Sequence, residues 1–246
     1  MPNVLITGAG RRAGIAAACA VALAQAGWDV GIRHWRPYDR DQPPSSRDDE
    51  PLALLEELRS LGARAEAAEI DLAEATGPFR LFEELKSRMG PFSALVAAHC
   101  RDLELPLMHT PADEFDRHFA VNARSVALLI QEFARRLPGS DGRIVAFTSD
   151  ALAENVPYGV SKRALDGAIQ AAALELGPRG IRANSMNPGP TDTGWISDDV
   201  REELSGRSPL GRVGLPEDSA HLVSFLLSPE GAWITDQVLH SDGGFR

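Results

Sequence analysis

Short apolar runs alternate with longer amphipathic stretches along almost the whole chain. A short apolar run between glycine, proline or polar residues is typical of a buried β-strand, whereas apolar positions that recur every three to four residues indicate an α-helix. The predicted strands are Val4–Ile6, Val30–Ile32, Ala65–Ile70, Ser93–Ala98, Arg143–Phe147, Ile181–Met186 and Gln237–His240. The predicted helices are one that ends near Gln25 and others at about Leu52–Leu61, Phe79–Met89, Ala112–Leu137, Tyr158–Leu176 and Pro216–Leu227.

This alternation predicts an α/β protein in which helices cover both faces of a parallel sheet and the crossovers are right-handed. No linker divides the chain, so we expect a single domain over residues 1–246. An eight-stranded α/β barrel has a similar length and alternation and stays open at this point. The polar, proline-rich stretch Pro37–Pro51 predicts an unusually long connection that is either disordered or a flap.

Three glycines mark the turn between the first strand and the first helix. Within Thr7–Gly14, the residues Gly8, Gly10 and Gly14 allow the backbone to approach a pyrophosphate, and the helix N-terminus behind them offers N–H donors. Their spacing differs by one residue from the usual dinucleotide fingerprint. The position directly after the first strand favours the doubly wound parallel sheet of a dinucleotide-binding Rossmann fold over the barrel.

Tyr158 and Lys162 lie four residues apart in a predicted helix and therefore share one of its faces. A tyrosine is a poor acid or base at neutral pH, but a fixed cation nearby favours the phenolate and lowers the pKa. We therefore expect this pair to move a proton, although the same spacing also occurs where a ring packs beside a solvated amine.

Composition excludes several classes of function. The net charge of −10 argues against binding to nucleic acid or to an anionic membrane, while a local basic pocket can still receive a phosphate. Cys19 and Cys100 have no metal-ligand spacing, so neither a disulfide framework nor a metal site is expected. The apolar run Ala13–Ala24 is too short to span a membrane, and the N-terminus does not resemble a signal peptide. The expected compartment is the cytoplasm.

Several motifs in order resemble those of the short-chain dehydrogenases/reductases, and the resemblance covers nearly the whole chain. The glycine turn matches except that Arg12 stands at the family's middle glycine, as in pteridine reductases. The ending Leu239–Gly244 is also typical of the family. The other matching positions are Asp71 with Leu72, Asn122, Ser149, the Tyr-x-x-x-Lys pair Tyr158 and Lys162, and the segment Asn187–Thr193 with its Pro-Gly pair.

The resemblance implies a reversible carbonyl reduction in which hydride leaves a nicotinamide. Tyr158 would then be the acid/base, and Ser149 would hydrogen-bond the carbonyl oxygen. Lys162 would lower the pKa of the tyrosine and hold the ribose hydroxyls. Asn122 would sit behind Lys162 and order a water molecule, or it would bond a backbone carbonyl, as helix asparagines do.

Charge at the end of the second strand predicts NADP(H) as the cofactor. An NAD enzyme places an acid there, whereas this chain has Arg33–Arg36, with Arg11 and Arg12 in the neighbouring turn. Arginine bonds to a 2′-phosphate are worth about 1.5 to 3 kcal/mol, enough to favour NADPH. The residues expected at the cofactor are Gly8, Gly10, Arg11, Arg12, Gly14, His34, Trp35, Arg36, Asp71, Leu72, Ala98, Tyr158, Lys162, Pro188, Gly189, Thr191 and Thr193.

Two more departures from the family bear on the site. Most members have Asn-Asn-Ala-Gly where this chain has Ala97–Cys100. We expect His99 to fill space, with donation to a ribose or a carbonyl as the alternative, and Cys100 to be a packed small residue. Only eight residues separate Ser149 from Tyr158, fewer than is usual, which predicts a more open site or one completed by another loop.

The substrate is less defined. A lid is expected near residues 190–212, with apolar contacts from Trp195 and Ile196. The tail resembles 3-oxoacyl-carrier-protein reductases, whose acidic carrier would need a basic patch, for which Arg135, Arg136, Arg201 and Arg212 are candidates. A reductase of pterins, quinones, sterols or polyols, and a nucleotide-binding regulatory protein without turnover, remain alternatives. As in the family, a homo-oligomer, tetramer or dimer, is expected.

Overall fold

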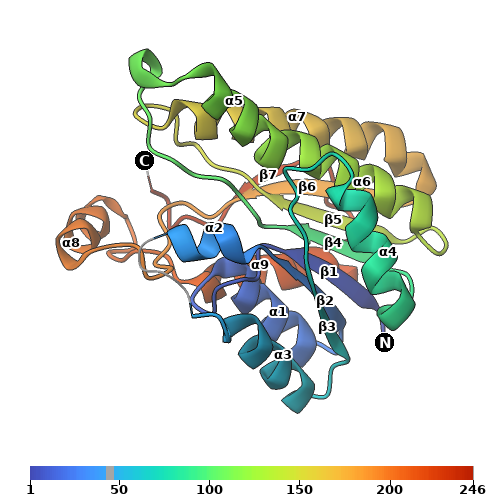
Figure 1. Cartoon of the computed structure of the whole chain (residues 1–246). Helices are drawn as coiled ribbons and strands as arrows, with labels where there is room; N and C mark the ends of the chain where they lie inside the picture. The colour runs from blue at the N-terminus through green and yellow to red at the C-terminus, as the bar shows by residue number, and fades with distance from the viewer. Residues whose placement is uncertain (43–46, 246) are drawn as a thin grey trace.

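The computed structural model describes residues 1–42 and 47–245, and it has one parallel seven-stranded sheet between two layers of helices (Figure 1). The strand order is β3-β2-β1-β4-β5-β6-β7, and the six pairings of neighbouring strands are all parallel. The strands are β1 (Asn3–Thr7), β2 (Asp29–His34), β3 (Ala65–Glu69), β4 (Ala94–Ala97), β5 (Gly142–Phe147), β6 (Ile181–Asn187) and β7 (Val238–His240). The predicted doubly wound sheet is thus confirmed, and the barrel is excluded.

The order in which strands are added to the sheet reverses between β1 and β4. Strands β2 and β3 lie on one side of β1, and β4 to β7 lie on the other. The connections that follow β1 and β4 therefore run to opposite faces of the sheet. Such a switch point leaves a crevice at the carboxyl ends of the strands, where ligands of open α/β sheets bind. The glycine turn after β1 and the segment Ala98–Asp102 after β4 form its two sides.

Each face of the sheet has its own apolar core. Successive residues of β1 belong to opposite cores, with Val4 and Ile6 in one and Leu5 in the other, as expected for a strand covered on both faces. One layer of helices contains α1 (Ile15–Gln25), α3 (Glu50–Ser60) and α9 (Pro216–Leu227). The other contains α4 (Gly77–Met89), α5 (Ala112–Phe119), α6 (Ser125–Arg136) and α7 (Val156–Leu176) (Figure 1).

The helix predicted over Ala112–Leu137 has an irregular turn in its middle. A π-helical segment, η2 (Ala120–Arg124), joins α5 to α6. A π-turn adds a residue to one helical turn and is frequent at functional sites, because it redirects a side chain without ending the helix. Asn122 lies in this segment.

Two stretches expected to lack regular structure contain helices. The long loop predicted at Pro37–Pro51 is wrong at both ends, because α2 (Arg36–Asp41) follows β2 directly and α3 begins at Glu50. The part of that prediction that concerns residues 43–46 lies outside the described residues. The predicted lid contains α8 (Asp198–Arg207). Its N-cap is Ser197, whose Oγ accepts a hydrogen bond from the Val200 N–H. Along residues 1–42 and 47–245, no helix has the length and apolarity to cross a membrane.

Candidate active site

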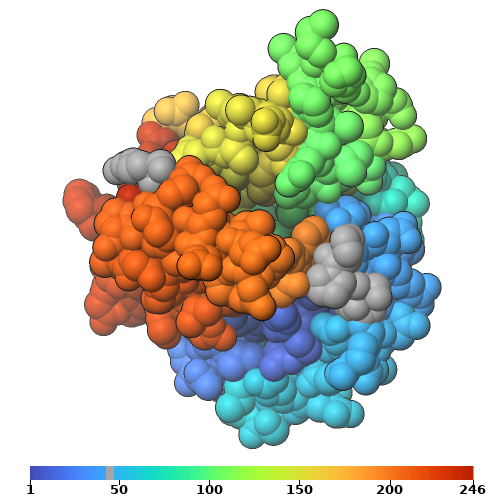
Figure 2. Space-filling view, turned by 90° about the vertical axis from the view of Figure 1, so that its left-hand side faces the viewer, coloured from blue at the N-terminus to red at the C-terminus, as the bar shows by residue number. Residues whose placement is uncertain are grey.

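A cavity of about 540 Å³ occupies the crevice at the carboxyl edge of the sheet. Figure 2 looks onto this edge, where the orange segment that includes α8 lies between the blue N-terminal part and the green part of the chain. The lining comes from the turn after β1, from α2, from the segment after β4 and from the lid. Of the residues expected at the cofactor, Gly8, Arg11, Gly14, Trp35, Asp71, Ala98 and Thr193 line it.

Lys162 and Tyr158 lie on the first turns of α7 and are not among the residues that line this cavity. Pro157 in the first helical turn and the carbonyl of Asn155, which accepts from the Gly159 N–H, start the helix just before the tyrosine. Lys162 is only 2% exposed, and its Nζ donates a 2.7 Å hydrogen bond to the Phe147 carbonyl. The ammonium lies 5.6 Å from the centroid of the Tyr158 ring. The predicted pair is therefore brought together.

The pKa of Tyr158 lies well above its usual value, the opposite of the direction expected from the sequence. Burial of the phenol, which penalises the phenolate, is the largest cause, and the carboxylate of Asp102 adds to it. A hydrogen bond with Ser149 opposes the shift. Burial also lowers the pKa of Lys162. The phenol therefore holds its proton through neutral pH.

Ser149 stands two residues after the end of β5, with its hydroxyl toward Tyr158. Its Oγ also accepts a 3.1 Å hydrogen bond from the Ala151 N–H, which fixes the turn after the strand. Ser149 and Tyr158 together can offer two O–H donors to one substrate oxygen.

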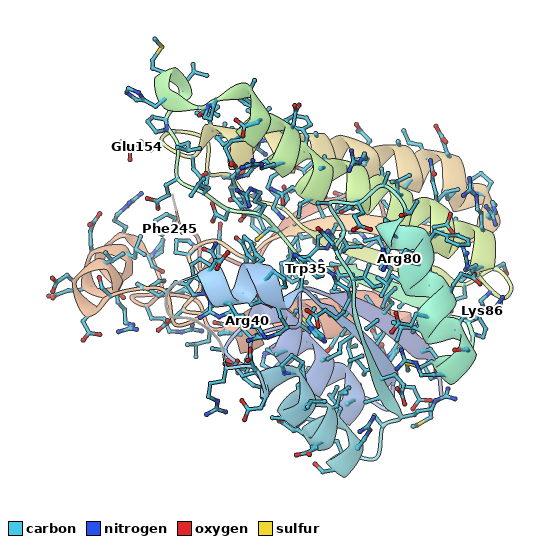
Figure 3. The ribbon with its side chains drawn as sticks, in the orientation of Figure 1. Trp35, Arg40, Arg80, Lys86, Glu154 and Phe245 are labelled. Atoms are coloured by element: carbon cyan, nitrogen blue, oxygen red, sulfur yellow. The ribbon has the colours of Figure 1, made fainter. Side chains whose placement is uncertain are left out.

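The short connection between Ser149 and Tyr158 is held closely against α7. A Cβ on Gly159 would lie 2.0 Å from the Ala151 carbonyl oxygen, so only glycine allows the loop to turn back here. Glu154 takes a left-handed conformation with φ of 64°, and Figure 3 labels it in this loop, just before the first turn of α7. Asn155, also in this loop, donates from Nδ2 to Asp102 Oδ1 at 2.6 Å. This bond joins the short loop to the segment after β4.

Asn122 is fully buried in η2, and both ends of its side-chain amide are hydrogen-bonded to neighbouring residues. Its Oδ1 accepts from the Arg101 N–H at 2.7 Å, and its Nδ2 donates to the Arg101 carbonyl at 2.8 Å and to Ser161 Oγ at 2.9 Å. Ser161 in turn donates to the Tyr158 carbonyl. The amide therefore makes the backbone contact that the sequence left as one alternative, and it ties η2 to both α7 and the segment after β4.

The glycine turn has the close approaches that its sequence requires. Gly8 has φ of 89°, and a Cβ there would lie 2.7 Å from the His99 backbone nitrogen. Gly14 is the N-cap of α1, so the free N–H groups of that helix face the crevice. The lid closes over this turn, because the Arg11 guanidinium lies 4.7 Å from the centroid of the Trp195 ring and donates to the Thr193 carbonyl.

Of the four arginines expected beside the adenosine end of the cofactor, two line the cavity and two pair with acids elsewhere. Arg33 is buried, donates from Nε to the Ile70 carbonyl at 2.7 Å and lines the cavity with Arg11. Arg12 pairs with Glu57 of α3. Arg36 pairs with Asp48 at 2.8 Å. The guanidinium groups of Arg12 and Arg36 are therefore committed to carboxylates, which differs from the predicted convergence of all four arginines.

Other expected cofactor contacts are backbone features or are buried in the core. Leu72 is 1% exposed in the apolar core, so its side chain does not reach the crevice. Burial lowers the pKa of His34, and the charge of Glu69 on the adjacent strand opposes this shift. After β6, Gly189 has φ of 59°, and the Thr191 hydroxyl bonds the carbonyls of Pro188 and Gly189 at 3.3 Å each. This turn is thus preformed.

His99 does more than fill space. Its Nδ1 lies 2.6 Å from Thr7 Oγ1 at the end of β1, and its Nε2 lies 2.7 Å from Ser125 Oγ on α6. Because the Ser125 hydroxyl donates to the Val121 carbonyl, its oxygen accepts from Nε2–H of the ring. With Nδ1 as the acceptor of the Thr7 hydroxyl, the ring is neutral. Burial lowers its pKa accordingly. Cys100 is packed, and burial raises its pKa, as expected for an unreactive thiol.

Sequence reasoning missed Tyr38 and Asp39 of α2, which line the cavity. The Tyr38 hydroxyl accepts from the Asp102 N–H at 3.0 Å and lies 3.4 Å from the Asp102 carbonyl. Trp35, at the start of α2, is labelled in Figure 3 close to the carboxyl ends of the strands. The signal in the sequence was the unusual length of Pro37–Pro51, for which a flap was one of the two interpretations. Among the described residues no group of side chains is arranged to hold a metal ion.

Comparison with known proteins agrees with this geometry. A family model described as enoyl-(acyl carrier protein) reductase matches residues 8–246. An oxidoreductase of uncharacterised function from Bacillus subtilis, YjdA, is 36% identical over 252 residues, which covers 98% of this chain and 95% of that protein.

Solved structures match over nearly the full length. The angucycline C-6 ketoreductase LanV, with bound NADP, is 31% identical with a TM-score of 0.87, and the match covers 99% of this chain and 95% of that one. A short-chain dehydrogenase from Burkholderia cenocepacia in complex with NADP is 31% identical with a TM-score of 0.88, over 99% of this chain and 97% of that one.

Proposed function

The chain belongs to the short-chain dehydrogenase/reductase family of oxidoreductases and uses NADP(H), and on that premise we propose that it reduces a carbonyl compound with Tyr158 as the proton donor. The observation that carries the proposal is the meeting of three groups from two parts of the chain: Ser149 after β5, and Tyr158 with Lys162 on α7.

The crevice fits the cofactor. Gly8 and Gly14 expose the backbone and the N-terminus of α1 where a pyrophosphate would lie, and Arg11 and Arg33 supply positive charge beside it. Ala98 and Asp71 line the same cavity on the side of β4 and β3. NADPH, when bound, supplies a hydride to the carbonyl carbon.

The chain's own residues handle the proton. As the carbonyl carbon gains the hydride, its oxygen gains negative charge, and the proton of Tyr158 Oη passes to that oxygen to give the alcohol. Ser149 donates a hydrogen bond to the same oxygen and fixes its position, which is worth roughly 2 to 4 kcal/mol at comparable sites. Lys162 stabilises the tyrosinate that forms, because its ammonium lies 5.6 Å from the ring.

Two observations favour a substrate with an apolar body over a carrier-bound acyl chain. The four arginines expected to receive an acidic carrier protein all pair with acids of this chain: Arg135 with Glu132, Arg136 with Glu83 and Glu132, Arg201 with Asp192 and Arg212 with Asp218. Leu103, Leu152 and Trp195 are each about two-fifths exposed on the segments that bound the site. LanV, which acts on an angucycline, is a relative with a substrate of this kind.

A substrate panel tests the proposal. NADPH oxidation would be followed with aromatic and alicyclic ketones, aldehydes, quinones, a pterin, a sterol ketone, a sugar and a small 3-oxoacyl thioester, for the native chain and for Tyr158→Phe. We expect turnover of at least one apolar ketone and its loss in the variant. Faster turnover of the thioester would instead favour the acyl substrate.

The regulatory alternative predicts a different result in the same assay. A protein that uses the fold without turnover would bind NADPH and oxidise it with no member of the panel. The connected set of Asn122, Ser161 and Tyr158, with Lys162 on the same helix, supports an enzyme, because a binding protein has no need to hold these groups in register.

We also propose that the protein is a homo-oligomer, a tetramer or a dimer. Phe119, Val160 and Leu174 are exposed apolar residues on α5 and α7, and Trp233 is 98% exposed near the C-terminal strand. Burial of such residues against a second copy would remove apolar surface from water. Light scattering with size-exclusion chromatography measures the mass, and a monomer at micromolar concentration would contradict this proposal.

A further inference from the structure

The carboxylate of Asp39 lies directly over the glycine turn. A Cβ placed on Gly10 would be 1.9 Å from Asp39 Oδ2 and 2.8 Å from its Cγ. Asp39 lies on α2, so this acid reaches the turn from the segment after β2 and not from the strand end itself. Its side chain is half-buried and lines the main cavity.

Arg11 and Arg33 line the same cavity as this carboxylate. Burial raises the pKa of Asp39, and the charges of Arg36, Arg33 and Arg11 oppose that rise in that order, while Glu50 adds to it. Arg11 and Arg33 receive the reciprocal influence, because Asp39 is one of the acids that offset the lowering of their pKa values by burial. Asp39 therefore neutralises charge on the same arginines that line the cavity.

Helix α2 is held in place at its far side. The Tyr38 hydroxyl, next in sequence to Asp39, bonds the backbone of Asp102 across the crevice. At the near side, the Arg36 backbone N–H donates to Glu69 Oε1 on β3. The helix thus bridges the two sides of the switch point, and the position of Asp39 does not depend on its own side-chain contacts alone.

The place that Asp39 occupies matches the place of a phosphate. In dinucleotide-binding folds the adenosine ribose lies between the glycine turn and the end of the second strand, and a 2′-phosphate is received there by arginine. In this chain that position is bounded by Gly10 and Arg11 on one side and Arg33 on the other. A carboxylate and a phosphate oxygen compete for the same guanidinium donors.

We propose that Asp39 is a cofactor-selectivity residue, an internal anion that competes with the 2′-phosphate of NADP(H) for the arginines beside the glycine turn. NADPH must displace this carboxylate, whereas NADH, which has no 2′-phosphate, need not. The proposal rests on the use of NADP(H) stated above. It predicts that the preference of the native chain for NADPH over NADH is smaller than that of a variant without the Asp39 carboxylate.

Equilibrium binding tests the proposal without any carbonyl substrate. NADPH and NADH affinities would be measured by cofactor fluorescence for the native chain, for Asp39→Asn and for Asp49→Asn. Asp49 supplies the matched control, because it is an exposed acid of the same connection between β2 and α3, paired with exposed Arg47. Competition by 2′-AMP and by 5′-AMP would locate any effect at the phosphate position.

The expected result is specific to one variant and to one phosphate. Asp39→Asn should bind NADPH and 2′-AMP about tenfold more tightly, with NADH and 5′-AMP changed less than about twofold. Asp49→Asn should leave all four within about threefold of the native values. Equal gains for NADPH and NADH, equal gains in both variants, or weaker NADPH binding in Asp39→Asn would each overturn the proposal. Failure to find a carbonyl substrate would leave these binding ratios unaffected.

Discussion

Lys162 Nζ donates a 2.7 Å hydrogen bond to the carbonyl oxygen of Phe147. Phe147 is the last residue of β5, two positions before Ser149, and Lys162 lies one turn after Tyr158 on α7. A single buried contact therefore sets the strand end that carries the serine against the helix that carries the tyrosine. The lysine has a structural task in addition to its electrostatic one.

Replacement of Lys162 should therefore reduce stability as well as activity. Lys162→Met removes the donor and leaves the buried Phe147 carbonyl without it, a loss of about 1 to 3 kcal/mol in the free energy of unfolding. Lys86→Met, at an exposed lysine of α4, should change it by less than about 0.5 kcal/mol. Urea denaturation measures both. Equal stability of the two variants would show that the bond to Phe147 contributes nothing.

Ser149→Ala tests the second oxygen donor. Because the hydroxyl assists mainly as charge develops on the carbonyl oxygen, kcat should fall by about 30-fold to 1000-fold while KM changes little. Steady-state kinetics on the best substrate of the panel would show this. A large rise in KM with unchanged kcat would mean that the serine only binds the ground state.

The pH dependence follows from the direction of the Tyr158 shift. Burial raises its pKa, so the protonated form needed for reduction persists through neutral pH. The kcat/KM for reduction should stay level to about pH 9 and fall only above the ordinary tyrosine value of about 10, while oxidation of the alcohol, which needs the phenolate, should rise with pH. A reduction profile that falls with a midpoint near pH 7 would contradict the assignment.

Two glycines of α7 form a matched pair. An Ala at Gly159 would place its Cβ 2.0 Å from the Ala151 carbonyl oxygen, so the loop from Ser149 must shift, and we expect stability to fall by about 1 to 3 kcal/mol and activity by about tenfold or more. A Cβ at Gly167 meets nothing within 4 Å among the described residues, so Gly167→Ala should stabilise by up to about 1 kcal/mol. Thermal unfolding and kcat/KM of both variants test the contrast. A harmless Gly159→Ala would refute the close packing.

The periodic elements were predictable because each buries a regular apolar pattern. Helix α9 ends where the sequence predicts, whereas α8 was missed because none of its residues is buried, so no apolar stripe marks it. Helix α2 was missed for a similar reason, since it is short, polar and contains Pro37. The π-turn at Asn122 leaves the helical pattern of its neighbours almost unchanged, so nothing in the sequence indicates it.

The motif residues of the candidate site could be recognised in the sequence, but the residues that pair with its charged side chains could not. Arg12 stands 45 positions from Glu57, its partner on α3, and no local pattern connects them. The sign of the Tyr158 shift was also beyond the sequence, because the lysine beside it is visible in the motif while the burial that outweighs it is a property of the assembled fold. Charge pairing and burial depend on distant segments.

The most direct test of the central claim is kcat/KM for NADPH-dependent reduction of the best panel ketone at pH 7, compared between the native chain and Tyr158→Phe, with NADPH affinity measured in both. The account predicts a loss of at least about 100-fold in the variant with NADPH affinity within about threefold of the native value. A variant that reduces the ketone as fast as the native chain would contradict the assignment of Tyr158 as the proton donor.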